Sequence, residues 1–281
     1  MEFARSTVKM SAAAADVLRG QRRGLVVLIY HRVGRRSTMA VDLPLGMFAD
    51  QIAWLRSTLP IVSLDEGLAW VAAADEPWNG AVDDDGVWTD DIRVAITFDD
   101  GTSDLAELAL PILADYGVPA TFYVTTEFIE DQVEFPHDGV PITWSALRDC
   151  LSTGLVTVGS HTHTHAILDR IPDAEVAFEL DRSIGLISDR LDVLPTHFAY
   201  PKAVMGSPGA DRAVRRRFVS AALAGGHTNR PGTTDPFRLA RMPVQASDGD
   251  AWFRRKAFGG MALEESIRQL VNRKRYAGLT H

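Results

Sequence analysis

The chain has a single cysteine, Cys150, among its 281 residues. One thiol excludes an intrachain disulfide and a zinc site built from cysteines. Long apolar runs are also missing, because no segment approaches the roughly 18 apolar residues of a membrane span. Residues Met1 to Arg23 lack the continuous apolar core of a secretion signal, since their longest uncharged stretch, Met10 to Ala15, is bounded by Lys9 and Asp16. We therefore expect a soluble, cytoplasmic protein, with export as the open alternative.

Positive charge is scarce as well. The 29 lysines and arginines are outnumbered by 37 acidic residues, which leaves a net charge of -8 and argues against a nucleic-acid partner. The imbalance is strongest in residues 75–91, which contain no lysine or arginine but two tryptophans, Trp78 and Trp88. We expect this stretch to be an acidic loop insertion, either solvated or acting as a lid.

Short apolar runs alternate with helical patterns along most of the chain. This alternation predicts an α/β fold in which parallel strands are covered by helices, and we expect one TIM-like barrel in a single domain over residues 24–281, preceded by a helical extension over residues 1–23. The expected strands are Leu25 to Tyr30, Val94 to Phe98, Ala120 to Thr125, Leu155 to Gly159, His197 to Tyr200, Phe218 to Ala222 and Leu239 to Val244. The expected helices include Phe48 to Arg56, Ser103 to Tyr116, Ala174 to Leu191 and Asp211 to Arg217.

Two polar clusters follow predicted strands. Asp99 and Asp100 come directly after one strand, and His161, His163 and His165 come after another. In a parallel barrel the carboxyl ends of the strands meet at one face, so these side chains can converge. His161 and His165 are four residues apart, and together with one carboxylate they could hold a metal ion with open positions for water and substrate. The second carboxylate would then be free to act as a base.

The two clusters resemble known motifs. Residues 97–101 and 160–165 are similar to the first and second motifs of polysaccharide deacetylases of the NodB-homology type, carbohydrate esterase family 4. The resemblance implies a distorted (β/α)7 barrel, with Asp99 as the general base. It also implies that Asp100, His161 and His165 bind one divalent metal ion, for which we expect zinc. His163 has no role in the family pattern and is expected to support the ligands or lie at the surface.

Other segments resemble the family but depart from it at Ala199, and at Lys202 and Ala203, where many members have an aromatic residue and a glycine. Residues 28–33 look like the first strand of the subgroup that deacetylates exported or biofilm-type glucosamine polymers, and residues 198–201 look like the third motif. Many members have an arginine that orients the base where this chain has Ala199. Arg241 is our candidate substitute, and its alternative is an ordinary solvated arginine. We assign substrate contacts to Tyr200, Pro201 and His31.

The general acid is the second gap in the resemblance. The family commonly uses a histidine in a late Leu-x-His motif, and the only late match ends at His281, where chain termini are usually disordered. We therefore treat that match as coincidental. His227, on a glycine-containing loop, is our candidate acid.

These assignments predict a metal-dependent hydrolase that removes N-acetyl groups from an amino-sugar or glycan substrate. A divalent ion would polarise the amide carbonyl and lower the pKa of its water to about 7. Two alternatives stay open. The same metal site could hydrolyse another C–N bond, in a cyclic imide or ureide, or the protein could bind glycans without turnover. A homo-oligomer is compatible with the sequence, which does not specify the sugar, the linkage or the metal.

Overall fold

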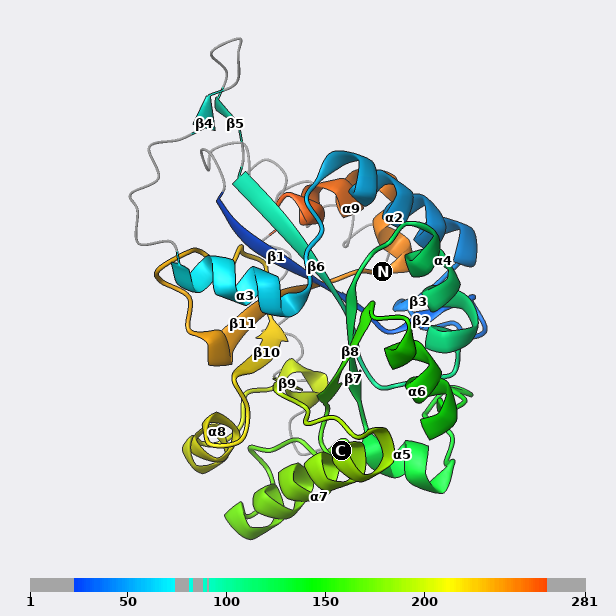
Figure 1. Cartoon of the computed structure of the whole chain (residues 1–281), viewed down its shortest axis with the longest axis vertical. Coiled ribbons are helices and arrows are strands. Elements are labelled where there is room, and N and C mark those ends of the chain that lie inside the picture. The colour runs from blue at the N-terminus through cyan, green and yellow to red at the C-terminus, as the bar shows by residue number, and fades with distance from the viewer. Residues whose placement is uncertain (1–22, 74–80, 83–87, 90, 262–281) are drawn as a thin grey trace.

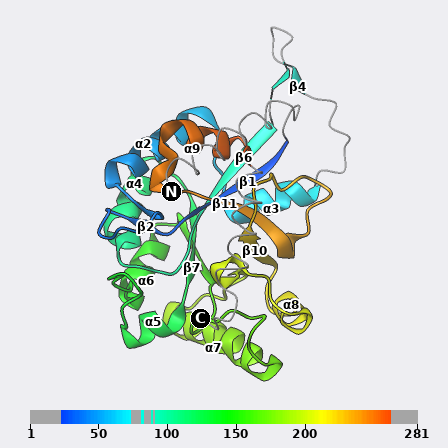
Figure 2. The ribbon, with the colours of Figure 1, turned by 180° about the vertical axis from the view of Figure 1, so that it is seen from behind.

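The computed structural model describes residues 23–73, 81–82, 88–89 and 91–261. At its centre is a closed barrel of seven strands, in which every neighbouring pair is parallel (Figures 1 and 2). Strand β1 pairs with both β6 and β11 and thereby closes the barrel. The predicted (β/α)7 barrel is confirmed. Its strands are β1 (Arg23–Tyr30), β6 (Asp91–Phe98), β7 (Ala120–Val124), β8 (Val156–Ser160), β9 (His197–Ala199), β10 (Ser220–Ala224) and β11 (Leu239–Pro243).

Helices surround the strands. In Figures 1 and 2, α2 and α9 lie beside each other at one end of the view, and α7 and α8 at the opposite end. The four predicted helices are present, but α5, α6 and α9 were not expected. The helices are α2 (Leu45–Thr58), α3 (Leu64–Ala73), α4 (Leu110–Asp115), α5 (Thr126–Asp131), α6 (Trp144–Ser152), α7 (Asp173–Leu191), α8 (Pro208–Arg215) and α9 (Gly249–Ala257).

Shorter elements connect these parts. The helix expected from Ser103 begins instead as the π-helical segment η1, and Pro111, which has no amide hydrogen to donate, lies at the start of α4. Two further strands, β2 and β3, form a small parallel pair. These elements are η1 (Leu105–Ala109), η2 (Pro201–Ala203), η3 (Pro236–Arg238), η4 (Ala246–Asp248), β2 (Arg32–Val33) and β3 (Asp42–Leu43).

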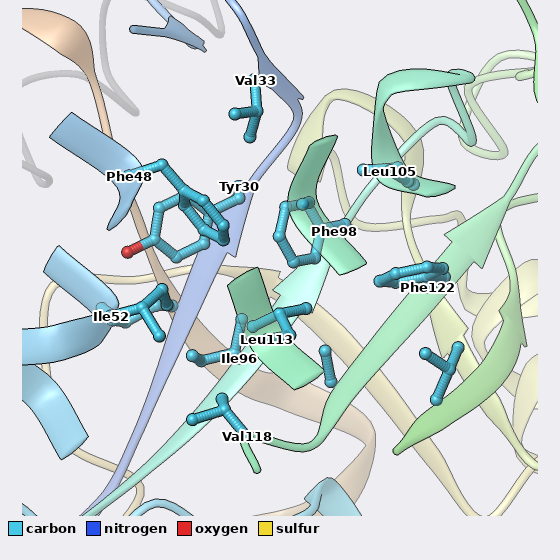
Figure 3. Close-up of a cluster of buried hydrophobic side chains, with 14 of the residues drawn as sticks. Tyr30, Val33, Phe48, Ile52, Ile96, Phe98, Leu105, Leu113, Val118 and Phe122 are labelled. Atoms are coloured by element: carbon cyan, nitrogen blue, oxygen red, sulfur yellow. The ribbon is translucent and has the colours of Figure 1, made fainter. Parts of the chain in front are cut away.

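The outer faces of the strands carry the largest part of the core. Figure 3 shows Tyr30 from β1 and Phe98 from β6 meeting Phe48 and Ile52 from α2. The ring centroids of Tyr30 and Phe48 are 5.2 Å apart, and those of Tyr30 and Phe98 are 5.4 Å apart. Burying each such side chain contributes about 1.5–3 kcal/mol, so this packing holds the helices against the barrel.

The inner faces of the strands form a second, smaller cluster. Val27, Ala95, Tyr123 and Ala199 point inward and are buried there, and helix α3 contributes Leu64. Because side chains alternate along a strand, the positions two and four residues after an inward apolar residue also point inward. Counted from Ala95 in β6, these positions are Thr97 and Asp99. The apolar layer inside the barrel therefore gives way to polar side chains where this strand ends.

Several expectations fall wholly or partly outside the described residues. They include nearly all of the N-terminal extension over residues 1–23 and most of the acidic insertion over residues 75–91. Within that insertion, β4 (Ala81–Val82) and β5 (Trp88–Thr89) pair antiparallel. Of the helices that the structure describes, none combines the length and the apolar composition that a bilayer crossing requires.

Candidate active site

Asp100, His161 and His165 converge at the carboxyl end of the barrel. Asp100 follows β6 and the two histidines follow β8, and one ligand atom from each lies within 4.8 Å of the others. Asp100 Oδ1 is 3.7 Å from His161 Nε2 and 3.6 Å from His165 Nε2. The two imidazole centroids are 5.0 Å apart. The structure therefore brings together the three residues that we expected to bind a metal.

The geometry of this triad fits a divalent cation. Two ligand atoms bound to one zinc ion at about 2.1 Å and at a tetrahedral angle lie about 3.4 Å apart, close to the separations seen here. His161 Nδ1 donates to the carbonyl oxygen of Ala199 at 2.8 Å, which leaves the lone pair of His161 Nε2 directed at Asp100. A hydrogen bond from the other ring nitrogen is the usual way in which a protein sets the tautomer of a metal-binding histidine.

Electrostatics keep Asp100 and His165 in the forms that could bind a metal ion. Burial and the neighbouring His161 lower the pKa of His165 to about 3, so His165 is neutral near pH 7. Burial by itself would raise the pKa of Asp100, but His31, His165 and His161 outweigh it and hold that pKa well below its usual range. Asp100 is therefore a carboxylate beside two imidazoles.

Asp99 is paired with Arg241 next to this triad. Arg241 Nη1 and Nη2 donate to the two carboxylate oxygens of Asp99 at 2.6 and 2.8 Å, and both side chains are buried. Nη1 also donates to Thr97 Oγ1 at 3.1 Å, and the guanidinium carbon lies 5.0 Å from the ring centroid of Tyr123. Burial raises the pKa of Asp99, but the charges of Arg241 and His161 lower it further, so the net pKa is lower than usual.

Unusual backbone conformations surround the site. Asp100, Thr162 and His165 have positive φ values of 75°, 69° and 65°. Residues other than glycine rarely adopt such angles, and each costs of order 1–3 kcal/mol unless the surroundings hold it. Because these angles occur at Asp100 and His165 and between the two histidines, the fold holds the segments that carry the triad in strained conformations.

His31 lies beside the two aspartates. The amide of Asp99 donates to the carbonyl oxygen of Tyr30 at 3.0 Å, which places the residue after Tyr30 next to the site. His31 interacts electrostatically with Asp99 and Asp100, and its Nδ1 is buried with no hydrogen-bond partner within the described part of the chain. Burial lowers the pKa of His31, although the two carboxylates oppose this effect.

The other candidate residues are placed differently. The side chain of Tyr200 points outward from the barrel into a hydrophobic cluster, where its ring lies 5.0 Å from that of Phe198, so it is not brought to the metal triad. Pro201 is buried at the start of η2. His227 is exposed on the loop between β10 and β11. His163 is not in the triad, because its Nδ1 lies 3.0 Å from Thr126 Oγ1 and its ring packs against Phe178.

Residues 87–214 match the family model described as polysaccharide deacetylase. This part of the chain is similar to polysaccharide deacetylases. Polysaccharide deacetylases are hydrolases of non-peptide C–N bonds. A comparison with curated proteins found no match.

Solved structures share the fold of this chain. IcaB from Ammonifex degensii is 24% identical with a TM-score of 0.71, and the match covers 85% of this chain and 98% of that one. The Streptococcus pyogenes deacetylase PplD, solved with acetate, is 16% identical with a TM-score of 0.68, covering 83% and 98% of the two chains. A de-N-acetylase from Aggregatibacter actinomycetemcomitans is 17% identical with a TM-score of 0.65, covering 83% and 99%.

Two residues near the candidate active site were missed by the sequence reasoning. Lys202, in η2, interacts electrostatically with Asp100 and His165. Its signal was visible, because Lys202 stands where the family has an aromatic residue. Glu179, in α7, bonds to the segment between the two histidines, and it looked like any other acidic residue of an amphipathic helix.

Proposed function

We propose that this protein uses one divalent metal ion, zinc in our assignment, to remove N-acetyl groups from an amino-sugar unit of a glycan. The observation that supports this most is the arrangement of four side chains. Asp100, His161 and His165 offer a ligand set, and Asp99 is the residue next to Asp100. When bound, the ion would supply Lewis acidity to the amide carbonyl and to a water molecule.

Asp99 is our candidate for the group that accepts the proton of the attacking water. Arg241 binds both of its oxygens through Nη1 and Nη2, which fixes the carboxylate plane and keeps Asp99 ionised. A carboxylate held by two charge-assisted hydrogen bonds can still accept a proton through its remaining lone pairs. Arg241 therefore positions Asp99, a role that Ala199 cannot fill because its methyl side chain has no hydrogen-bond donor.

His31 is our candidate for the group that delivers a proton to the leaving amine. An amide nitrogen departs poorly as an anion, so a donor must reach it. The side chain of His31 interacts electrostatically with both aspartates, and its Nδ1 has no acceptor among the described residues, whereas His227 is exposed on a loop. We therefore transfer the acid role from His227 to His31.

Acetate release and metal content test the proposal together. Purified protein supplied with Zn²⁺ is expected to retain it and to release acetate from N-acetylglucosamine oligomers. Asp99→Asn should bind the ion but lose turnover, and His161→Ala should lose both. Asp115→Asn, the same change at an exposed site on α4, is the control and should keep both.

Each other outcome counts against a stated part of the proposal. A protein that binds no metal contradicts the ligand assignment. If the protein binds metal but releases no acetate from any acetylated sugar, hydrolysis of a cyclic imide or ureide would favour another C–N substrate. If none of these compounds is hydrolysed, the result favours glycan binding without turnover. Normal activity in Asp99→Asn would refute the assignment of Asp99 as the general base.

A further inference from the structure

Glu179 is a buried carboxylate that faces the segment joining the two histidine ligands. It lies on α7 and is 5% exposed. Its Oε2 accepts from the backbone amides of His163 and Thr164 at 2.9 and 2.8 Å, and its Oε1 accepts from Thr164 Oγ1 at 2.8 Å. Three hydrogen bonds thus run from one side chain to the residues between His161 and His165.

The same segment is held on its other side by α5. The amide of Glu127 donates to the carbonyl oxygen of His163 at 2.9 Å, and the amide of Thr126 donates to that of Thr162 at 3.4 Å. The carbonyl groups of Thr162 and His163 are therefore bound by the start of α5, and the amides of His163 and Thr164 by Glu179. No other side chain of the described residues is recorded as accepting from the amides of His163 and Thr164.

This grip matters because the segment is strained. Thr162 and His165 both have positive φ, and Thr162 is β-branched, which makes this conformation especially unfavourable. A segment free to relax would leave these angles, and His165 Nε2 would move away from Asp100. Interactions that hold the segment therefore decide whether the two imidazoles already face one point before a cation arrives.

We propose that Glu179 is a positioning residue that sets the metal affinity of the site by holding residues 161–165 in their strained conformation. The inference rests on the proposed function only in taking Asp100, His161 and His165 as metal ligands. Glu179 does not bind the ion. Without it, metal binding would have to supply the free energy that orders the segment, and the affinity would fall accordingly.

The effect of geometry can be separated from that of charge. A glutamine at position 179 keeps an oxygen acceptor for the two backbone amides, and its NH₂ group can donate to Thr164 Oγ1, but it removes the negative charge. An aspartate keeps the charge but withdraws the acceptor by one methylene. If Glu179 acts by position, Glu179→Asp must be worse than Glu179→Gln. If it acts by charge near the cation, the order is reversed.

The experiment measures Zn²⁺ binding to metal-free protein by equilibrium dialysis, together with the melting temperature of the metal-free protein. Glu179→Ala and Glu179→Asp are expected to weaken Zn²⁺ binding by about 10–100-fold, as is typical when a residue supporting the metal ligands is lost. Glu179→Gln should bind like the wild type. Glu175→Ala, exposed four residues earlier on α7, is the matched control and should also bind like the wild type.

The results separate this inference from the proposed function. If Zn²⁺ affinity is unchanged in Glu179→Ala and Glu179→Asp, or if Glu179→Gln is the weakest binder, the inference is wrong. If Glu179→Ala does not fold, the aspartate and glutamine variants decide. Wild-type protein that binds Zn²⁺ but releases no acetate contradicts the deacetylase assignment and leaves the role of Glu179 intact.

Discussion

Arg241 reaches Asp99 across an intervening strand. Arg241 lies in β11 and Asp99 follows β6, and β1 separates these strands in the barrel. The two residues are 142 positions apart in the sequence, yet they form two hydrogen bonds of 2.6 and 2.8 Å inside the protein. The contact joins the end of the second barrel strand in chain order to the last one.

Removing one partner of this buried pair should be costly. Arg241→Met leaves the Asp99 carboxylate buried and without its cation, and we expect a loss of about 3–5 kcal/mol in the free energy of unfolding. Urea unfolding at pH 7 measures this loss. Adding Asp99→Asn should recover part of it, because the uncompensated charge is then gone.

A matched arginine provides the control for this experiment. Arg238 has a half-exposed side chain near Asp235, so Arg238→Met should change stability by less than about 0.5 kcal/mol. Equal losses of unfolding free energy in Arg238→Met and Arg241→Met would show that the buried pair of Arg241 and Asp99 contributes no more to stability than an exposed ion pair.

The pair also makes stability depend on pH in a defined direction. The net pKa of Asp99 is lowered in the folded state, because Arg241 and His161 outweigh the opposing effect of burial. The contribution is then complete above the unfolded pKa of about 3.9 and is lost as the pH falls through the lower folded value. Arg241→Met should be less sensitive to acid than the wild type between pH 5 and pH 2. Unfolding free energies measured across that range decide the question, and parallel curves would contradict the assignment.

Moving the arginine back to the family position tests whether the two positions are equivalent. Ala199 is buried among Val27, Tyr123 and other inward side chains, so Ala199→Arg alone should overpack the barrel and lower stability by about 1–3 kcal/mol. In an Arg241→Ala background the same change has space for its guanidinium. We expect the double variant to release acetate about tenfold faster than Arg241→Ala, which corresponds to about 1.4 kcal/mol of transition-state stabilisation. Equal rates would show that position 199 cannot orient Asp99.

Replacing His31 should affect the chemical step and leave metal binding unchanged. His31→Gln is expected to lower kcat by about 10²- to 10⁴-fold, the usual contribution of a proton donor, with normal Zn²⁺ affinity. His227→Gln is the comparison, because His227 was the expectation from sequence. If His227→Gln loses more activity than His31→Gln, the proton donor is His227, on the loop between β10 and β11, and not His31.

His197 should contribute to acid sensitivity away from the site. It is buried between Ser220 Oγ at 2.8 Å and Asp65 Oδ1 at 3.0 Å, and burial lowers its pKa. As the pH drops below about 6.5, His197 is protonated in the unfolded chain but stays neutral in the folded chain. The free energy of unfolding therefore falls with falling pH. In His197→Asn the free energy of unfolding should fall less steeply between pH 6.5 and pH 5, by up to about 1.4 kcal/mol per pH unit. An unchanged slope would show that His197 does not carry this effect.

The barrel and the convergence of Asp100 with His161 and His165 were predictable because their signals are local. All seven expected strands are present, since a short apolar run between turns defines a buried parallel strand by itself. Asp99 and Asp100 directly follow one such run, and His161 follows another, so their location at the carboxyl ends followed from chain order. Helices α5 and α6, of six and nine residues, were not among the helices expected.

What the sequence alone determined, then, was the order of the strands and which of them end in polar residues. Tertiary structure decided which distant side chains meet. The direction of Tyr200 depends on the alternation set by its strand neighbours, and the partners of Asp99 and of the His161–His165 segment come from β11 and α7. Such contacts leave no local pattern, because they arise only when the closed barrel brings separate segments together.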